Sequence, residues 1–249
     1  MKKLLTFCLL ALLFTGVSAQ QQIILAEDFN GNQLGWPEQD NEKASAEFSA
    51  GKYKIVHHGV SGSYLFPVDV AKLDQGQDFR ISTEITQYQG EDNDGFGLVW
   101  GGKDAGNFYG FNINAAGQYR VYQYRDYNYS EIKSFTQAGD YIRGKGMKNK
   151  LEVRKTGGML SFFANGRFLY SMPSKKFFGP QVGYVLYNQT EVHISSLDIV
   201  QEKAMPVVFE DPLEDNSNGW ITDARDSTIL IQKEGKLFMR NEEGKGATY

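Results

Sequence analysis

The sequence predicts an all-β protein: a two-sheet antiparallel β-sandwich of the jelly-roll type, followed by the start of a second, similar domain. Three observations support this class. Aromatic residues make up 14% of the chain, and glycines number 27. Short runs of aromatic and β-branched residues are separated by breaks rich in Gly, Asn and Asp, which is typical of strands joined by tight turns. No window of about a dozen residues has helical periodicity, so little α structure is expected.

Residues 1–19 have the features of a secretory signal peptide. Lys2 and Lys3 precede an apolar run, and small residues precede a cleavage site after Ala19. An N-terminal anchor is the alternative, but the apolar run is shorter than the roughly 18 residues of a membrane span. We therefore expect export to the periplasm, the cell surface or the extracellular space, with no membrane span. Cys8 is lost with the signal peptide, so the mature chain has no cysteine for disulfides or zinc ligation.

The clearest strand pattern lies in the stretch Gly95–Arg125, where three apolar runs are separated by the breaks GGKDAGN and NAAGQ. In the middle run Tyr109, Phe111 and Ile113 alternate with the residues between them. This period of two is typical of a strand with one face on a core. We therefore expect this meander to lie at the centre of the sandwich.

Further strands follow from the same pattern, and Asn165-Gly166 predicts a type I′ hairpin. About a dozen strands are too many for one flat sheet, so they should form two packed sheets. In chain order the expected strands are Ile23–Phe29, Tyr53–Val56, Tyr64–Val68, Asp78–Tyr88, Phe96–Trp100, Phe108–Ile113, Tyr119–Tyr124, Leu151–Arg154, Met159–Phe163, Gln181–Tyr187 and Val192–Val200.

An internal repeat sets the expected domain organisation. The motif EDF…GW of residues 27–36 is echoed by EDP…GW of residues 210–220, and Gly-Lys follows each tryptophan after fifteen residues. Chance similarity of two strand–turn–strand segments is the alternative. If the repeat is real, the second copy stops early and further domains would lie beyond Tyr249. The expected segments are a signal peptide at 1–19, a β-sandwich at 22–202, a linker at 203–206 and the truncated start of a second sandwich at 207–249.

The chain resembles bacterial laminin-G-like or concanavalin A-like lectin–glucanase jelly-roll modules over about residues 25–200. The motifs that carry the resemblance are DF…GW, FGLVWG, NFYGFNI, GQYRVYQY, KLEV, LSFFANGRFLY, QVGYVLYN and LDIV. The resemblance implies a secreted concanavalin-like sandwich. That superfamily includes lectin-like binders, spacers and true glucanases, so the fold by itself does not choose a function.

Catalysis is not expected from the residues present. Laminarinase-type members of the superfamily carry a Glu-x-Asp-x-x-Glu pattern on one strand, which supplies the paired carboxylates of a retaining glycosidase. Here Glu84 lies on an expected strand, but its same-face neighbours carry hydroxyls rather than acids. The histidines His57, His58 and His193 are expected to be hydrogen-bonded or solvent-facing rather than catalytic.

The formal net charge of −4 indicates neither a nucleic-acid partner nor attraction to an anionic membrane.

No catalytic residue, metal ligand or cofactor is assigned from the sequence. Asp92, Asn93 and Asp94 resemble half of a calcium loop, but glycines stand where its first and last ligands would be. Many jelly rolls hold a structural calcium between their first and last strands, where Asp28 and Asp198 lie here. Hydrogen-bonded aspartates at turns and strand ends are the alternative.

A ligand groove is predicted on the face of the central meander that points away from the core. Glycines in strand interiors allow a ligand to approach the backbone, and tyrosines provide stacking surfaces for sugar rings. The alternative is that the glycines accommodate sheet curvature and the tyrosines pack beneath a loop at 126–134. The residues expected at this groove are Gly97, Gly110, Asn112, Arg120, Tyr122 and Tyr124.

Three functions remain open at this stage. The first is a non-catalytic glycan-binding module whose partner is a polysaccharide. The second is a structural or adhesive module whose ligand is a protein, and the third is a divergent glycoside hydrolase. An exposed aromatic platform favours the first, a face of mixed charge favours the second, and two carboxylates facing each other in a cleft favour the third.

Overall fold

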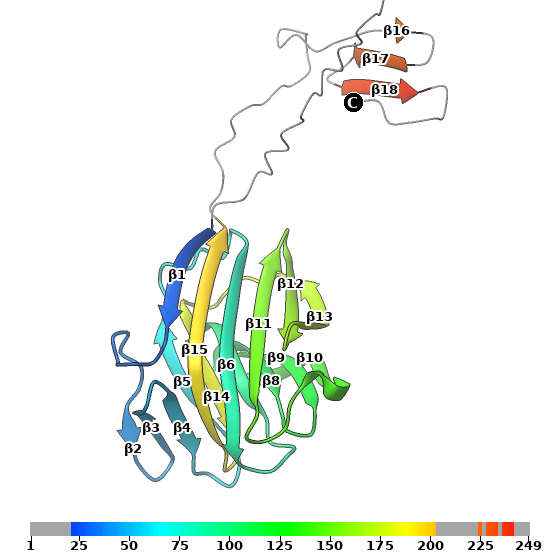
Figure 1. Cartoon of the computed structure of the whole chain (residues 1–249). Coiled ribbons are helices and arrows are strands. Elements are labelled where there is room, and N and C mark those ends of the chain that lie inside the picture. Colours follow the sequence, from blue (N-terminus) through cyan, green and yellow to red (C-terminus); the bar gives the residue numbers. More distant parts are fainter. Residues whose placement is uncertain (1–20, 203–223, 226–227, 234–235, 242–249) are drawn as a thin grey trace, which may run out of the picture. The chain divides into compact units, whose positions relative to one another are not determined.

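The computed structural model describes residues 21–202, 224–225, 228–233 and 236–241 (Figure 1). By its contacts the chain divides into two compact units, residues 1–204 and residues 205–249. The expected signal peptide at 1–19 and linker at 203–206 lie outside the described residues, so those predictions are not tested. Among the described residues, no helix is long and apolar enough to cross a membrane.

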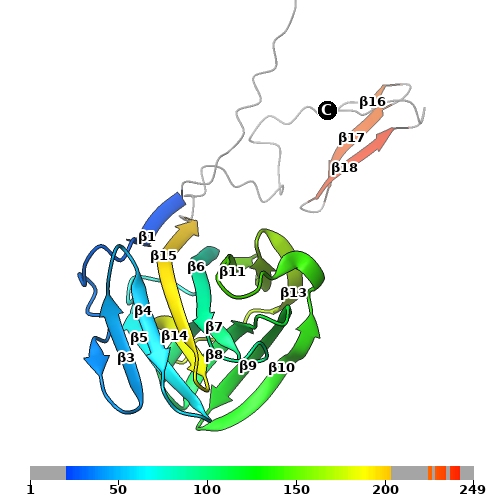
Figure 2. The same cartoon turned by 60° about the horizontal axis from the view of Figure 1, so that its bottom comes forward.

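The first unit confirms the all-β class: two antiparallel sheets pack face to face as a sandwich (Figures 1 and 2). The larger sheet has nine strands, with β1 (Gln21–Glu27) attached to β15. Its order is β13 (Arg167–Pro173), β12 (Met159–Ala164), β11 (Lys148–Thr156), β6 (Phe79–Gln89), β15 (Glu191–Glu202), β4 (Tyr53–His57), β3 (Ala44–Phe48) and β2 (Gln39–Asp40).

The smaller sheet has six strands and includes the central meander. Within residues 21–202 the only helix is a single 3₁₀ turn, η1 (Gly139–Tyr141). The sheet order is β10 (Asn128–Gln137), β9 (Gln118–Arg125), β8 (Asn107–Ile113), β7 (Phe96–Asp104), β14 (Gln181–Tyr187) and β5 (Ser63–Asp69).

The core lies between the two sheets and follows the alternation of the strands. Tyr109, Phe111 and Ile113 of β8 are all in it, as the period-two pattern predicts. Trp100 of β7 is fully buried in the same core and stacks on Tyr109 at a ring separation of 5.6 Å. The inward faces of β8 and its neighbours are thereby fixed, and so are the residues that must point outward.

The structure confirms the hairpin that the sequence predicts at Asn165-Gly166, but it also contains a polar edge strand that the sequence analysis did not predict. Asn165 and Gly166 have φ of 51° and 77°, the two positive values that a type I′ hairpin requires. Strand β10 covers residues 128–134 of the segment that the alternative to the groove treated as a loop at 126–134. The residues of β10 are mostly polar and partly exposed, so hydrophobic alternation does not predict a strand there. The segment forms a strand because it pairs with β9, and this pairing has two register shifts.

The second unit contains one small antiparallel sheet of β16 (Ala224–Arg225), β17 (Thr228–Lys233) and β18 (Lys236–Asn241). Its pairing resembles that of β2, β3 and β4 in the first unit, where a two-residue strand also precedes a longer hairpin. Ala44 pairs with His57 in one hairpin, and Thr228 pairs with Asn241 in the other. The same number of residues separates the two partners in each case.

Candidate functional site

The outer face of the six-stranded sheet carries all six residues expected at the groove. Because Phe111 and Ile113 of β8 point into the core, the residues between them point outward. Cross-strand pairing places them side by side: Gly97 is paired with Asn112, Asn112 with Arg120, and Gly110 with Tyr122. Sequence alternation therefore located this face and its residues correctly.

The structure places these residues differently from an open groove. The ring of Tyr122 is completely buried and lies on Gly110, where an added Cβ would stand 2.2 Å from the tyrosine Cζ. At Gly97 an added Cβ would stand 2.2 Å from the carbonyl oxygen of Phe111 in the neighbouring strand. Gly110 makes room for the ring of Tyr122, and Gly97 makes room for the backbone of the neighbouring strand. The expected groove floor is therefore filled.

Aromatic rings cover this outer face instead. Tyr122, Tyr124 and Phe108 pack with Tyr129 of β10 and Tyr187 of β14, and we call these five rings the outer aromatic cluster. Phe108 stacks on Tyr124 at 4.9 Å, and Tyr124 meets Tyr129 edge to face at 5.5 Å. Tyr122 forms the buried base, while Tyr129 is 41% exposed at the surface. Among the five rings only Tyr129 is exposed; Tyr124 and Tyr187 are half-buried, and Phe108 and Tyr122 form a packed apolar layer.

Arg120 lies in a cage of aromatic rings at one side of this cluster. Its guanidinium carbon is 4.5 Å from the ring centre of Tyr187, 4.6 Å from Phe135, 4.8 Å from Tyr122 and 5.9 Å from Tyr129. Such contacts are favourable cation–π interactions, which gain strength when the cation is partly desolvated. We call these residues the Arg120 cage.

No carboxylate pairs with Arg120 among the described residues. Its Nη1 donates to the hydroxyl of Tyr129 at 3.4 Å, and that hydroxyl donates to Glu131 Oε1 at 3.1 Å. Hydrogen bonds from Ser134 and Tyr129 lower the pKa of Glu131, so it is ionised at neutral pH. The guanidinium is therefore linked to a carboxylate only through a tyrosine.

The cage tyrosines stay neutral over the physiological range. Burial raises the pKa of Tyr187 to about 12, and burial raises the pKa of Tyr122 well above its usual value. Neutral phenols cannot neutralise the guanidinium charge, so the site keeps its positive charge. Sequence reasoning missed Tyr129, Phe135 and Tyr187, because a pairing across three strands is not visible in one sequence.

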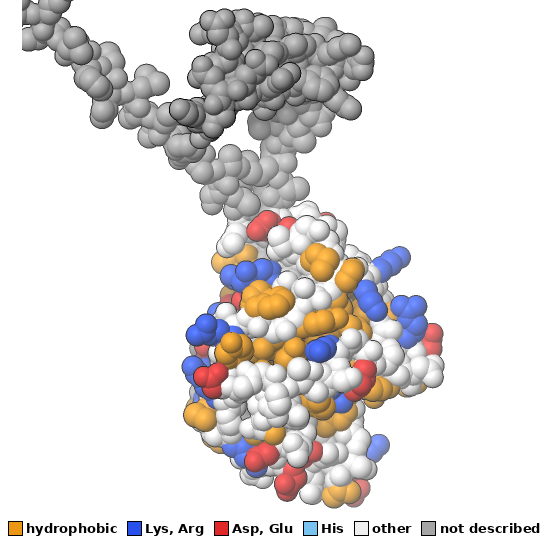
Figure 3. Space-filling view, turned by 90° about the vertical axis from the view of Figure 1, so that its right-hand side faces the viewer, with side chains coloured by type: hydrophobic (Ala, Val, Ile, Leu, Met, Phe, Trp, Pro, Cys, Tyr) orange, Lys and Arg blue, Asp and Glu red, His pale blue; other side chains and the backbone are white. Residues whose placement is uncertain are grey.

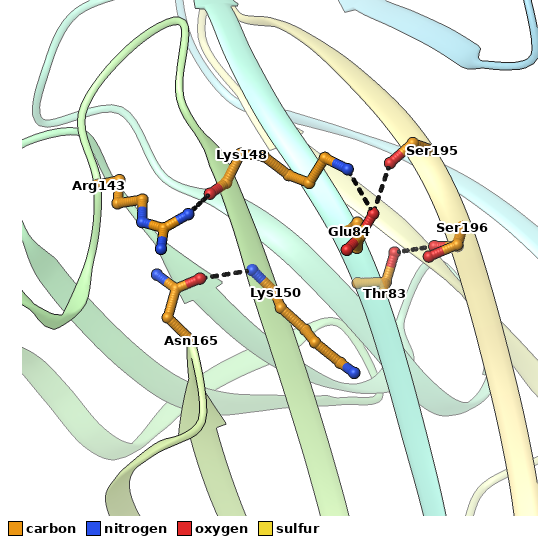
Figure 4. A network of polar contacts seen from close by, with 8 residues as sticks. All are labelled: Thr83, Glu84, Arg143, Lys148, Lys150, Asn165, Ser195 and Ser196. Atoms are coloured by element: carbon orange, nitrogen blue, oxygen red, sulfur yellow. Dashed lines mark hydrogen bonds and ion pairs between the residues drawn. The ribbon is translucent and has the colours of Figure 1, made fainter.

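The carboxylate considered for catalysis lies on the other sheet and is paired. Glu84 of β6 accepts from Lys148 Nζ at 2.7 Å and from Ser195 Oγ at 3.1 Å, on the outer face of the nine-stranded sheet (Figure 4). The hydrogen bond from Lys148 lowers the pKa of Glu84. An ionised carboxylate cannot act as a general acid at neutral pH, and both hydrogen bonds engage the same oxygen of Glu84.

His57, His193 and Asp28 have local hydrogen-bond partners. His57 is buried and bonds the carbonyl of Asn188 at 2.7 Å, and His193 lies 2.8 Å from Glu191 Oε1. The exposed carboxylate of Asp28 accepts from both the backbone and the side chain of Asn30. Within the part of the chain that the structure describes, no group of three metal-ligating side chains is found.

A second feature is a cleft of about 300 Å³ at the edge of the sandwich, beside η1 and β13. Tyr141 and Phe168 are among its lining residues and are 40% and 56% exposed. Figure 3 views this side of the molecule and shows hydrophobic side chains gathered there, with Lys and Arg around them. The outer face of the six-stranded sheet has buried polar atoms without a hydrogen-bond partner, whereas the described residues that line the cleft have none.

The comparisons with known proteins support the fold. No family model and no curated protein matches the chain. Among solved structures, the chain is similar to a protein described with endo-acting O-glycanases of the human gut microbiota that initiate mucin breakdown. That match has a TM-score of 0.51 and 8% identity, over 73% of this chain and all of the other.

Two further solved structures are similar to the chain at low sequence identity. The GH43 BlXynB protein from Bacillus licheniformis has a TM-score of 0.50 and 10% identity, over 70% of this chain and 39% of that one. The carbohydrate-binding module CBM66 from Bacillus subtilis has 17% identity, over 71% of this chain and 94% of that module, with a TM-score of 0.42. At these identities the first two similarities show a shared β-sandwich fold and no more.

Proposed function

We propose that the chain is an exported, non-catalytic glycan-binding module that binds its ligand on the outer face of the six-stranded sheet. The observation that carries this proposal is the outer aromatic cluster together with Arg120. Sugar rings stack on tyrosine faces and edges, while hydroxyl and guanidinium groups bond the sugar hydroxyls. The naming of one similar structure as a carbohydrate-binding module agrees with this proposal, although the likeness itself extends only to the fold.

A protein-interaction module is the second candidate. The outer face of the nine-stranded sheet carries pairs of opposite charge, Lys148 with Glu84 and Lys54 with Glu47. Mixed charge of this kind suits a polar protein partner, but exposed ion pairs are equally typical of a solvated surface. Charge reversal at Lys54 and Lys148 would abolish partner binding in this case and would leave glycan binding unchanged.

The domain organisation proposed with this function is a sandwich at 22–202, a linker at 203–206 and the start of a second copy at 207–249. The matching registers of the hairpins support it, and Ala44 lies as far from Trp36 as Thr228 lies from Trp220. Residues 22–202 alone should unfold cooperatively in denaturant, whereas residues 207–249 alone should not, because the three strands described there have no second layer to pack on. A cooperative transition in the short piece would remove the truncated-repeat proposal.

Affinity electrophoresis of the mature chain through gels containing neutral polysaccharides tests the binding proposal. Tyr124→Ala and Tyr129→Ala remove rings from the exposed side of the cluster. Each should weaken retardation several-fold, since an aromatic contact is worth about 0.5–1.5 kcal/mol beyond the area that it buries. Tyr141→Ala, at the edge cleft, is the matched control and should leave retardation unchanged. Equal retardation of all three variants and the wild type would contradict a site on this face.

A further inference from the structure

The two-residue turn between β9 and β10 contains a tyrosine in an unfavourable backbone conformation. Arg125 pairs with Asn128, and the residues between them, Asp126 and Tyr127, have φ of 50° and 62°. Two positive values are typical of a type I′ hairpin turn, whose second position is most often glycine. A bulky side chain is strained there, because its Cβ crowds the backbone. Glycine would form the same turn without this strain, so the turn alone does not explain the tyrosine.

The neighbouring β7–β8 turn holds Tyr127 in place. Tyr127 N donates to the Gly106 carbonyl at 3.1 Å, and Asp126 N donates to Asn107 Oδ1 at 3.1 Å. Gly106 N in turn donates to Asp104 Oδ1 at 2.9 Å. These hydrogen bonds join the two turns, and they fix the strained conformation of Tyr127.

The ring of Tyr127 lies with one face on Gly106. A Cβ added at Gly106 would stand 2.8 Å from both Cδ2 and Cε2 of the ring and 2.9 Å from Cγ. Nearly equal distances to three neighbouring ring carbons place the glycine over the face of the ring rather than at its edge. Tyr127 is nevertheless 75% exposed, so the opposite face of the ring is open to solvent. Burial therefore stabilises this ring little, and its rigid open face suits stacking against a sugar ring.

The turn lies at the end of the strands that carry the outer aromatic cluster. Tyr129 of β10 is two residues from Tyr127, and Phe108 of β8 is two residues from Gly106. Two residues of a strand span about 7 Å. Tyr127 and Tyr129 therefore provide two exposed rings at separate points of one hairpin. A ligand that stacks on both needs a separate sugar ring for each.

We propose that Tyr127 is a further stacking residue of the glycan site, and that the ligand is a polysaccharide chain bound along its length, with separate sugar rings on Tyr127 and Tyr129. This inference rests on the proposed glycan-binding function. A ring fixed before binding loses less conformational entropy on association, which is a benefit that a strained turn can give. An open ring does not enclose the terminal sugar of a chain, so this arrangement favours the chain interior.

Affinity electrophoresis of the full mature chain tests the proposal on a panel of neutral polysaccharides: barley β-glucan, laminarin, xyloglucan, galactomannan and arabinoxylan. Tyr127→Gly removes the ring and suits the positive φ, so the fold should be kept. We expect retardation to weaken about threefold or more, with an unchanged or higher urea midpoint. Wild-type retardation with a lower midpoint would overturn the inference, because the ring would then serve the fold alone.

Two further variants separate the position of the ring from its presence. Gly106→Ala keeps the ring but displaces it, since the added methyl group would clash with it, and should weaken retardation as Tyr127→Gly does. Tyr127→Phe keeps the flat face and should bind like the wild type. Tyr88→Ala is the matched control, because Tyr88 is 43% exposed on β6 of the other sheet, and it should leave retardation unchanged.

Oligosaccharides cut from the polysaccharide that retards the protein most strongly measure the length of the site. In competition with that polysaccharide, the hexasaccharide should displace the wild type better than the disaccharide. Tyr127→Gly should lose most of this gain with length, because one of the two stacking rings is gone. Equal competition by the disaccharide and the hexasaccharide in the wild type would overturn the inference.

The outcomes separate this inference from the proposed function. Weaker retardation of Tyr129→Ala with wild-type retardation of Tyr127→Gly would overturn the inference and leave glycan binding at the outer face in place. Retardation weakened as much by Tyr88→Ala as by Tyr127→Gly would also overturn it, because the effect would not be local to the turn. No retardation of the wild type by any member of the panel would contradict both.

Discussion

The two outer faces of the sandwich place their outward-pointing charged side chains in different surroundings. On the nine-stranded sheet, outward-pointing charges meet partners of opposite sign: Lys148 meets Glu84, and Arg154 meets Glu152. On the six-stranded sheet, Arg120 meets aromatic rings instead, above a fully buried Tyr122. Exposed ion pairs like those of the nine-stranded sheet are typical of a solvated β-sheet surface. The outer face of the six-stranded sheet buries aromatic rings outside the main core and leaves donors unpaired, which stability alone does not explain.

This contrast predicts a difference between the two faces in the free energy of unfolding. Aromatic packing on an outer face contributes stability through area removed from water, whereas exposed ion pairs contribute about 0–1 kcal/mol each. Substitutions on the two faces should therefore differ in size and in their response to pH. The following predictions use that difference, starting from the largest effect.

Tyr122→Ala should be the most damaging single change on either outer face. The buried ring is lost and a cavity remains over Gly110, which should lower the free energy of unfolding by about 3–5 kcal/mol, as for other buried aromatic residues. Urea unfolding of the mature chain measures it. Tyr122→Phe, which removes only the 3.4 Å hydrogen bond to Asn112, is the control and should cost about 1 kcal/mol. A loss below about 1 kcal/mol for the alanine variant would show that the ring is not part of a packed layer.

Gly110→Ala should destabilise by about 1–3 kcal/mol through overpacking. The new methyl would stand 2.2 Å from Tyr122 Cζ, so the tyrosine ring must move. A matched test is the double variant Gly110→Ala/Tyr122→Ala, where the clash is absent. The double variant should lose less than the sum of the two single losses, because the residues are in contact. Additive losses in the urea series would argue against the observed ring position.

Lys148→Met, on the other outer face, should change the free energy of unfolding by no more than about 1 kcal/mol. The Lys148 side chain is about half exposed, and its ammonium group pairs with the single carboxylate of Glu84. Chemical denaturation at neutral pH and low salt is the measurement. A loss as large as that of Tyr122→Ala would erase the distinction between the two faces.

The smallest expected effect is the pH dependence of the Glu84 contribution. Because the hydrogen bond from Lys148 holds the pKa of Glu84 below its usual range, the ionised carboxylate stabilises the folded state. That stabilisation is complete above the unfolded-state pKa and is lost as the pH falls through the lower folded-state pKa. Glu84→Gln should therefore differ from the wild type at pH 7 and converge with it in acid, once the pH falls below the folded-state pKa of Glu84. A difference that grows on acidification would give the opposite sign and refute the pairing.

The sequence predicted the fold class and the faces of the central strands because these follow from alternation. Tyr109 and Phe111 had to share a face, and that face had to be buried. It also predicted the hairpin at Asn165-Gly166, since only that turn type needs positive φ at both positions. These features depend on local chemistry, which one sequence contains.

The contents of the site could be predicted only in part. Alternation put Arg120, Tyr122 and Asn112 together, but whether the space over Gly110 was open depended on the rotamer of Tyr122. The cage rings come from strands that are distant in the sequence, Phe135 on β10 and Tyr187 on β14. Cross-strand packing of this kind is decided by tertiary structure, so periodicity cannot reveal it.

Hydroxyl-radical footprinting tests the central claim, that the outer face of the six-stranded sheet is the binding surface. The side chains are labelled with and without the polysaccharide of the panel that retains the protein most strongly. We predict that bound polysaccharide protects Tyr129 and Tyr124, while Tyr141 and Phe168 at the edge cleft keep their reactivity. Protection of Tyr141 and Phe168 with unchanged labelling of Tyr129 would place the ligand at the edge of the sandwich and contradict the account.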